Sequence, residues 1–263
     1  MRIGDLLDGE YLVDEIVMIS HALKKSRAWV LSHLDEKVPP EKLHEILRMI
    51  EQRKMGKPLH YIIGEREFMG FVFEVDEGVF IPRPETETLV EIALSKIEKG
   101  DIEVVAEIGV GSGVIGVSIA KIARVRVLGS DVNRKAVDLA LRNAKRLGVE
   151  DLVDFRVGEF LEPFRERVDE IDFVVSNPPY VEIGYAPPPE VRHEPEDAIF
   201  AGEDGLDFYR GYFGRYERMF DTLMEFSGKE GAKEFLKEVC PEVVFYEDLD
   251  GVERFFFCPS EPH

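Results

Sequence analysis

The fold is decided by one short stretch, Glu107-Ile108-Gly109-Val110-Gly111-Ser112-Gly113, which follows an apolar run typical of a buried strand and precedes a helical pattern. Glycines at such a strand-to-helix turn let the backbone bend sharply and bring a ligand close to the helix N-terminus, where free N–H groups and the helix dipole favour phosphate-like and ribose-bearing groups. The stretch therefore predicts a crevice for a nucleotide-like cofactor.

On both sides of this loop, strand-like and helix-like segments alternate. This alternation predicts an α/β fold with a doubly wound, Rossmann-like parallel sheet. The expected strands are Val104–Ile108, Val125–Ser130, Val153–Val157, Ile171–Ser176 and Thr222–Phe226, with helices starting at Glu85 and Val114 and spanning Arg134–Leu147 and Ala232–Val239. The apolar runs 243–246 and 254–258 flank Asp248-Leu249-Asp250-Gly251, which predicts a C-terminal antiparallel hairpin.

The first quarter of the chain has a different pattern. Apolar residues recur at helical spacing from Leu6 to Arg53, which predicts a small N-terminal helical domain over residues 1–67. The run Phe68 to Val75 then alternates aromatic and β-branched residues around a glycine and predicts a β-hairpin linker over residues 68–80. Residues 81–263 form the expected catalytic domain.

The glycine loop alone leaves two cofactor classes open. Gly111 and Gly113 together with Gly116 fit the dinucleotide pattern G-x-G-x-x-G, and Asp131 lies twenty residues after Gly111, where an acidic side chain accepts hydrogen bonds from ribose hydroxyls. Nicotinamide cofactors and S-adenosylmethionine share that ribose. The alternative is that these residues bind no ligand: the glycines then only form a tight turn, Asp131 is an ordinary strand-end residue and Asn133 caps the following helix.

A second stretch, Asn177-Pro178-Pro179-Tyr180, favours methyl transfer over hydride transfer. It follows a buried strand and so belongs at the carboxyl edge of the sheet, beside the cofactor crevice. The Asn177 side-chain oxygen and the Pro178 carbonyl can each accept one hydrogen bond from a planar NH2 group, while the two prolines fix the backbone and Tyr180 packs on the planar face. An ordinary Asn-Pro turn at a strand end is the structural alternative.

These stretches and their surroundings resemble the release-factor glutamine methyltransferase family, which is a class I family using S-adenosylmethionine. The resemblance runs from residue 56 to about 227. Besides the glycine loop and the Asn-Pro-Pro-Tyr tetrapeptide, it rests on Gly56-Lys57-Pro58-Leu59-His60-Tyr61-Ile62-Ile63-Gly64, Phe80-Ile81-Pro82-Arg83-Pro84-Glu85-Thr86-Glu87, Glu194-Pro195-Glu196-Asp197-Ala198 and Gly202-Glu203-Asp204-Gly205-Leu206.

The resemblance implies roles for individual residues. Those implied to contact the cofactor are Gly109, Val110, Gly111, Ser112, Gly113, Asp131, Phe160 and Asn177, with Phe160 beside the adenine. Those implied to bind or act on the substrate are Asn177, Pro178, Pro179, Tyr180, Phe80 and Arg83. Pro82 and Pro84 can also serve only to start the following helix.

The chain departs from the family pattern in two places. Glu107 and Val110 replace the usual aspartate and threonine. Both changes are compatible with cofactor binding, because backbone amides of the loop contact the ligand and these side chains do not. Residues 223–230 replace a family pattern of Glu-Ile-Gly with a nearby glutamine, which leaves the contribution of this segment open.

Composition limits the cellular locations and the binding partners to be expected. The net charge of -20 disfavours nucleic-acid binding, because that affinity rests on basic side chains. The spacing of Cys240 and Cys258 resembles neither a disulfide framework nor a zinc site and predicts a reducing, cytoplasmic location. No signal peptide, membrane span or metal-ligand spacing among the six histidines is apparent, so neither a membrane nor a metal is expected.

The sequence therefore predicts methyl transfer from S-adenosylmethionine to a protein glutamine amide, with release factors as partners and S-adenosylhomocysteine as the product. Another glutamine, for example in a ribosomal protein, and the exocyclic amine of adenine suit the same tetrapeptide. A nicotinamide-dependent dehydrogenase and a non-catalytic binding module with the same fold complete the alternatives.

Overall fold

The computed structural model describes residues 1–216 and 219–261, and contacts divide them into two compact units. The first unit contains Met1–Glu65 and the short segment Pro187–His193; the second contains Arg66–Ala186 and Glu194–His263. Because the segment Pro187–His193 packs with the N-terminal residues, the chain leaves the second unit and returns to it shortly after the tetrapeptide.

The first unit is helical, as its apolar periodicity predicts. Its elements are η1 (Gly4–Leu6), α1 (Leu12–Leu23), α2 (Arg27–Ser32), α3 (Pro40–Lys54), α4 (Leu59–Ile63) and η4 (Val191–His193). Met18, Ile19, Val30 and Ile46 are fully buried in its core. Arg53 at the end of α3 is also buried, and its guanidinium pairs with Asp14 and with Glu190 of the returning segment.

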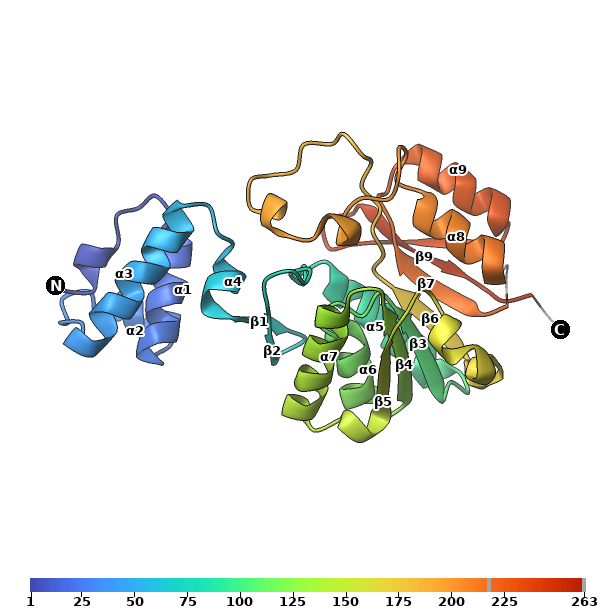
Figure 1. Cartoon of the computed structure of the whole chain (residues 1–263), viewed down its shortest axis with the longest axis horizontal. Helices are drawn as coiled ribbons and strands as arrows, with labels where there is room; N and C mark the ends of the chain where they lie inside the picture. The colour runs from blue at the N-terminus through green and yellow to red at the C-terminus, as the bar shows by residue number, and fades with distance from the viewer. Residues whose placement is uncertain (217–218, 262–263) are drawn as a thin grey trace. The chain divides into compact units, whose positions relative to one another are not determined.

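The second unit is built around a seven-stranded sheet of order β5-β4-β3-β6-β7-β9-β8 (Figure 1). Its strands are β3 (Val104–Ile108), β4 (Arg126–Asp131), β5 (Val153–Val157), β6 (Phe173–Ser176), β7 (Asp221–Glu225), β8 (Val244–Glu247) and β9 (Glu253–Cys258). The first five are parallel, while β9 is antiparallel to both β7 and β8. This arrangement confirms the predicted doubly wound sheet and its C-terminal hairpin.

Helices cover both faces of this sheet. The helical elements are α5 (Thr86–Lys99), α6 (Val114–Ala123), α7 (Arg134–Leu147), η2 (Glu150–Leu152), η3 (Glu162–Glu170), η5 (Glu196–Ala198), α8 (Asp207–Tyr216) and α9 (Glu230–Val239). Helices α5, α6 and α7 pack on one face and η3, α8 and α9 on the other. Phe255 and Phe257 of β9 point into the first layer and Phe256 into the second, as strand alternation requires.

A separate two-stranded hairpin precedes α5. It consists of β1 (Glu65–Phe68) and β2 (Phe71–Glu74), so it begins three residues earlier than the sequence pattern predicts. Met69 and Gly70 at its tip both have positive φ, of 51° and 74°, which suits a two-residue turn between strongly twisted strands. Asn143 of α7 anchors the hairpin by accepting from the Glu74 N–H at 2.7 Å and donating to the Glu74 carbonyl at 3.1 Å.

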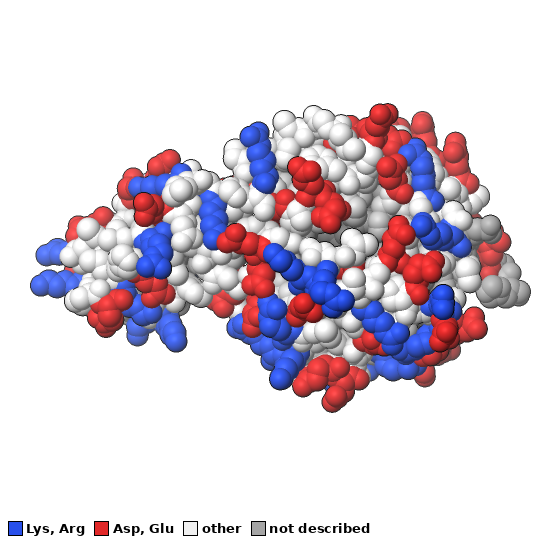
Figure 2. All heavy atoms as spheres, in the orientation of Figure 1, with Lys and Arg blue, Asp and Glu red and all other residues white. Residues whose placement is uncertain are grey.

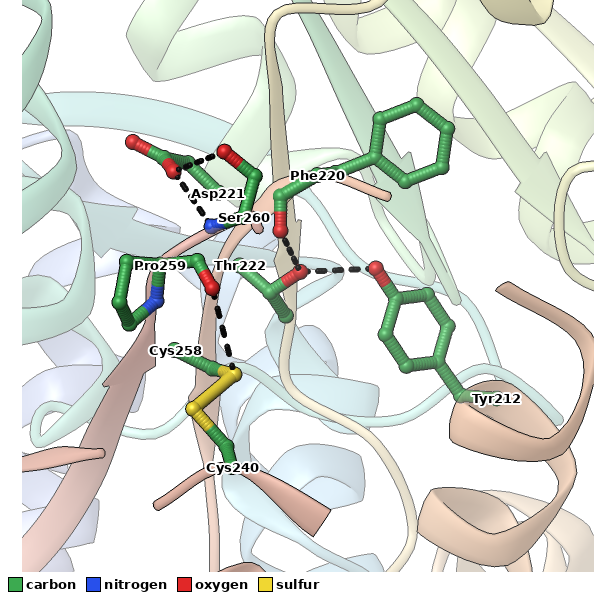
Figure 3. Close-up of a disulfide and its surroundings, with 8 residues drawn as sticks. All are labelled: Tyr212, Phe220, Asp221, Thr222, Cys240, Cys258, Pro259 and Ser260. Carbon is green, nitrogen blue, oxygen red and sulfur yellow. Dashed lines mark hydrogen bonds between the residues drawn. A yellow bond between two sulfur atoms is a disulfide. The ribbon is translucent and has the colours of Figure 1, made fainter. Parts of the chain in front are cut away.

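The prediction of two free cysteines is wrong, because Cys240 and Cys258 form a disulfide (Figure 3). Cys240 caps the C-terminal end of α9, and Cys258 is the last residue of β9. The hairpin formed by β8 and β9 brings the chain back under α9, and spacing along the sequence does not reveal this proximity. The cysteines therefore no longer argue for a reducing compartment. Within the described residues, no helix has the length and apolarity needed to cross a membrane.

Candidate active site

The strand register brings the two predicted motifs to one edge of the sheet. Ile108 at the end of β3 pairs with Ser176 at the end of β6 and with Ser130 near the end of β4. The residues that follow these strands, Gly109 and Asn177 among them, therefore leave the sheet side by side. In open α/β sheets, this carboxyl edge is where ligands bind.

The glycine loop has the conformation and the space that a ligand needs. Gly109, Gly111 and Gly113 have φ values of 76°, 52° and 82°, a region that glycine enters without strain. A Cβ on Gly109 or Gly111 would meet no atom within 4 Å, so the loop is open on that side. A Cβ on Gly113 would lie 2.9 Å from Ala140 Cβ, so this glycine lets α6 and α7 pack closely.

Val110 and Ser112 of the same loop are buried, and neighbouring elements hold the loop in place. The backbone N–H groups of Gly109 and Val110 donate to the Ser130 carbonyl at 2.8 and 3.1 Å, and Asn143 donates to the Ser112 carbonyl at 2.8 Å. The Ser112 hydroxyl has no hydrogen-bond partner within the described part of the chain. The loop is thus rigid, with one buried polar group available.

Asp131 ends β4 beside this loop. Its Oδ2 accepts from the Gly111 N–H at 2.9 Å and its Oδ1 from the Asn133 N–H at 2.8 Å. Burial raises the pKa of this carboxyl, and the two N–H donors oppose the rise. Each carboxylate oxygen keeps a further lone pair, so two hydroxyl groups can still bind here.

The side chain of Phe160 lies in the core beside α8. It is 7% exposed, and its ring packs against Phe208 with centroids 5.2 Å apart and under the Arg215 guanidinium at 4.6 Å. Its φ of 48° is left-handed, and its carbonyl accepts a hydrogen bond from Ser130. The backbone of residues 158–160 therefore lies close to the carboxyl end of β4, where the Gly158 N–H also donates to the Asp131 carbonyl.

Asn177 is held by a chain of hydrogen bonds that reaches two other elements. Its Nδ2 donates to the Thr86 hydroxyl at 3.0 Å, and this hydroxyl donates to Glu225 Oε2 at 3.0 Å. Tyr180 donates to the other carboxylate oxygen of Glu225 at 2.8 Å. Pro178 between them is buried, whereas Pro179 is partly exposed. The tetrapeptide is thus tied to the start of α5 and to the end of β7.

Glu225, the last residue of β7, has a buried carboxyl group. It is 2% exposed, and burial raises its pKa, while the hydroxyl donors Tyr180 and Thr86 and the nearby charge of Arg254 oppose the rise. Burial and the neighbouring carboxylate together raise the pKa of Tyr180, so its phenol keeps its proton. The Tyr209 hydroxyl donates to the Glu225 carbonyl at 2.7 Å and so fixes the backbone at this point.

The segment that contains Phe80 and Arg83 is fixed by Glu194. Arg83 donates to Glu194 Oε1 at 2.6 Å and to the Ile81 carbonyl at 2.9 Å, while the Ile81 N–H donates to Glu194 Oε2 at 3.0 Å. The Arg83 guanidinium lies over the Phe80 ring, 4.5 Å from its centroid. Thr86 lies at the end of this segment and accepts a hydrogen bond from Asn177, so it connects the segment to the tetrapeptide.

The structure gives Gly116 and Glu107 a packing role. Glu107 is 1% exposed, and its Oε2 accepts from the Gly116 N–H at 3.0 Å. A Cβ on Gly116 would collide with this carboxylate and lie 2.9 Å from Val127. The third glycine of the dinucleotide-like pattern therefore accommodates a buried acid, whose pKa burial raises well above its usual value.

Sequence reasoning missed the contributions of Thr86 and Glu225. Thr86 lies in a segment whose individual roles were open, and Glu225 lies in the segment that departs from the family pattern. The available signal was a single carboxylate, Glu225, within the otherwise apolar stretch from Leu223 to Phe226, at the end of a strand next to the tetrapeptide. No cluster of metal-ligating side chains occurs within residues 1–216 and 219–261.

The residues present fit S-adenosylmethionine. The open glycine loop at the start of α6, the Asp131 carboxylate with free lone pairs and the unpartnered Ser112 hydroxyl can together hold a ribose and the polar groups attached to it. The fold agrees with this fit. The catalytic domain of hMettl16 bound to MAT2A 3′UTR hairpin 1 superposes with a TM-score of 0.59 at 16% identity, covering 94% of this chain and 91% of that one. Fold and site together define a class I S-adenosylmethionine-dependent methyltransferase.

Sequence relatives identify the family. Two family models match, described as PrmC N-terminal domain over residues 10–64 and as Methyltransferase small domain over residues 72–188. A protein of Clostridium acetobutylicum named release factor glutamine methyltransferase is 41% identical over 207 residues, covering 77% of this chain and 73% of its own. Namesakes from Bacillus anthracis and Aquifex aeolicus are 37% and 34% identical, covering 93% and 97% of this chain and 91% and 94% of their own. The chain belongs to the release factor glutamine methyltransferase family.

Proposed function

We propose that this protein methylates the side-chain amide nitrogen of a protein glutamine, and that its substrate is the glutamine of the Gly-Gly-Gln motif in peptide chain release factors. The names of its relatives support this substrate. The observation that carries the proposal is the position of Asn177 and Pro178, directly after β6 and beside the glycine loop that follows β3.

The chemistry of a glutamine amide explains why these two residues are suited to the reaction. The nitrogen lone pair is delocalised into the carbonyl, so the planar group must be held with its nitrogen directed at the methyl donor. Asn177 Oδ1 and the Pro178 carbonyl each accept one N–H of the substrate amide. As positive charge develops on nitrogen these hydrogen bonds strengthen, which stabilises the transition state more than the ground state. S-adenosylmethionine supplies the methyl group on a sulfonium sulfur.

The remaining roles extend the same proposal. Gly109, Val110, Gly111, Ser112, Gly113, Asp131, Phe160 and Asn177 form the cofactor site, with Asp131 on the ribose hydroxyls. Tyr180 and Pro179 pack against the substrate amide, and Phe80 and Arg83 line the entrance. The helical domain at residues 1–67 recruits the protein substrate, and residues 68–80 link it to the catalytic domain.

Charge supports a protein substrate rather than a nucleic acid. The net charge is -20, and acidic and basic side chains are interspersed over the face drawn in Figure 2. A protein binds a nucleic-acid phosphate backbone tightly only where Lys and Arg side chains are clustered. We therefore expect no direct nucleic-acid binding and, with release factors as partners, a cytoplasmic location.

The test follows the methyl group. Purified protein and its Asn177→Ala variant are incubated with labelled S-adenosylmethionine and a release factor, and the label is mapped by mass spectrometry. We expect methylation of the Gly-Gly-Gln glutamine by the wild type only and no label on a release factor whose glutamine is replaced by alanine. Binding of S-adenosylhomocysteine should be retained in Asn177→Ala, although weakened, because Asn177 is only one of the proposed cofactor contacts. Cofactor binding without transfer to this glutamine would reject the substrate, and ribosomal proteins and DNA would be tested next.

A further inference from the structure

Two residues outside the tetrapeptide, Thr86 and Glu225, are linked to Asn177 by hydrogen bonds. The contacts Asn177–Thr86, Thr86–Glu225 and Tyr180–Glu225 form one continuous chain in the interior of the second unit. Thr86 and Glu225 are each 2% exposed, so water does not compete for these bonds. The chain joins the start of α5, the turn after β6 and the end of β7.

With Glu225 ionised, the chemistry of the groups determines the direction of every bond in this chain. An ionised carboxylate can only accept hydrogen bonds, so the single hydroxyl proton of Thr86 must go to Glu225. The Thr86 oxygen then has only lone pairs to offer Asn177, and the Asn177 group that meets it must be the NH2. The Asn177 carbonyl oxygen consequently points away from Thr86, on the other side of the Cβ–Cγ bond.

We propose that Glu225, acting through Thr86, is a positioning residue that makes Asn177 present its oxygen, and not its NH2 group, to the substrate amide. The proposal rests on the function proposed above for Asn177. An asparagine flipped by 180° would present its own NH2 donor to the substrate N–H that Asn177 Oδ1 is proposed to accept, and the substrate could not bind productively. The relay therefore selects the one orientation of Asn177 that accepts.

Burial raises the pKa of Glu225, and the donors and the charge next to its carboxylate oppose this rise and so support the ionised form that the relay needs. Two hydroxyl donors bind its two oxygens, and the positive charge of Arg254 stabilises the carboxylate. The Tyr180 phenol donates to the same carboxylate, so the relay holds both ends of the tetrapeptide. Arg254 is itself held by Asp248 through a 2.6 Å ion pair.

Isosteric substitutions separate the relay from mere packing. Thr86→Val removes the hydroxyl and keeps the shape; we expect kcat to fall on the order of 100-fold, as misplaced reacting groups do, while binding of S-adenosylhomocysteine is unchanged. Thr86→Ser retains the hydroxyl and should restore kcat to within about threefold of wild type. Glu225→Gln can present either an oxygen or an NH2 to Thr86, so we expect a smaller loss, on the order of 10-fold.

Tyr212→Phe is the matched control, since it deletes a buried hydroxyl of α8 that is hydrogen-bonded to Thr222 and lies outside the relay. We expect its kcat to stay near that of the wild type. Wild-type kcat in Thr86→Val, or equal losses in Thr86→Val and Thr86→Ser, would overturn the proposal.

A measurement without turnover distinguishes failure of the relay from failure of the proposed function. In a 15N–1H NMR spectrum, the Asn177 side-chain NH2 is identified by its absence in Asn177→Ala. We expect one of its protons to be protected from exchange in the wild type and in Thr86→Ser, and unprotected in Thr86→Val. Equal exchange in all three proteins would reject the relay even if glutamine methylation is confirmed. Protection without glutamine methylation would retain the relay and reject the substrate.

Discussion

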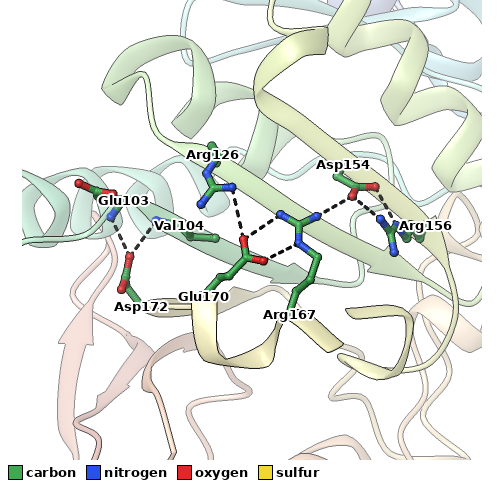
Figure 4. Close-up of polar contacts among 8 residues, drawn as sticks. All are labelled: Glu103, Val104, Arg126, Asp154, Arg156, Arg167, Glu170 and Asp172. Carbon is green, nitrogen blue, oxygen red and sulfur yellow. Dashed lines mark hydrogen bonds and ion pairs between the residues drawn. The ribbon is translucent and has the colours of Figure 1, made fainter. Parts of the chain in front are cut away.

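The two edges of the central sheet are built from similar polar residues that are used in opposite ways. At the carboxyl edge, Asp131 and Glu225 are largely withdrawn from water, and each accepts hydrogen bonds from neutral N–H or hydroxyl groups. At the amino edge, Arg167 forms exposed ion pairs with Glu170 and Asp154, and Arg126 and Arg156 extend the network (Figure 4).

The amino edge also contains contacts that hold neighbouring elements together. The Asp172 carboxylate, just before β6, accepts from the Glu103 and Val104 N–H groups at the start of β3, at 2.8 and 2.9 Å. The disulfide lies at the same edge, since Cys258 pairs with Thr222 near the start of β7. The comparison indicates that the carboxyl edge is organised for ligands and the amino edge for stability.

The largest expected effect is on cofactor binding at the carboxyl edge. Asp131→Ala removes the acceptor proposed for the ribose hydroxyls, the bond to the Gly111 N–H of the glycine loop and the bond to the Asn133 N–H, and each charge-assisted hydrogen bond contributes about 1.5–3 kcal/mol. We expect the Kd for S-adenosylhomocysteine, measured by calorimetry, to rise on the order of 100-fold.

Asp154→Ala is the control from the amino edge, where the carboxylate pairs with the partly exposed Arg156 and Arg167. It should bind S-adenosylhomocysteine as the wild type does. If both substitutions weaken binding equally, or if Asp131→Ala binds normally, the functional difference between the edges is contradicted.

The second prediction concerns the disulfide. It closes a loop of 18 residues, and cross-linking a loop of this length stabilises a fold by about 3 kcal/mol in the chain-entropy model. Reduction should therefore lower the free energy of unfolding by this amount, measured in urea with and without a reductant. Cofactor affinity should stay unchanged, because the bond lies far along β7 and β9 from the carboxyl edge.

Cys258→Ala should unfold as the reduced wild type does and should not respond to the reductant. Thiol labelling under denaturing, non-reducing conditions checks the bond directly. Quantitative labelling of both cysteines in freshly purified protein would show that they are free and would contradict the prediction.

The sequence predicted the arrangement of the sheet well because local patterns determine it. Apolar runs with strand periodicity, glycines after Ile108 and an acidic residue after the next strand all act within short windows of the chain. The same local patterns predicted that the glycine loop follows β3 and that Asn177 follows β6. Parallel pairing then brings these segments together without further information.

Features that depend on distant segments were not predictable in this way. Glu225 lies 139 residues from Thr86, and only the pairing of β6 with β7 brings it near the tetrapeptide. The disulfide likewise depends on the path of the C-terminal hairpin beneath α9. The sequence showed a carboxylate, Glu225, within the apolar stretch from Leu223 to Phe226, but not its partners.

The smallest effect is expected from the exposed ion network at the amino edge. Arg167 donates to Glu170 at 3.0 Å and to Asp154 at 2.9 Å, and its hydrogen bond lowers the pKa of Glu170. Because exposed pairs contribute little, Arg167→Ala should lower Tm by less than about 3 °C at pH 7.5 in low salt. The contribution of a carboxyl with a lowered pKa is present above its ordinary value of 4.5 and is lost as the pH falls through the folded-state value. The Tm difference between Arg167→Ala and wild type should therefore shrink toward pH 4 and in 1 M salt, where screening is strong. A large difference that persists in high salt would mean that this edge, like the site, depends on charges shielded from water.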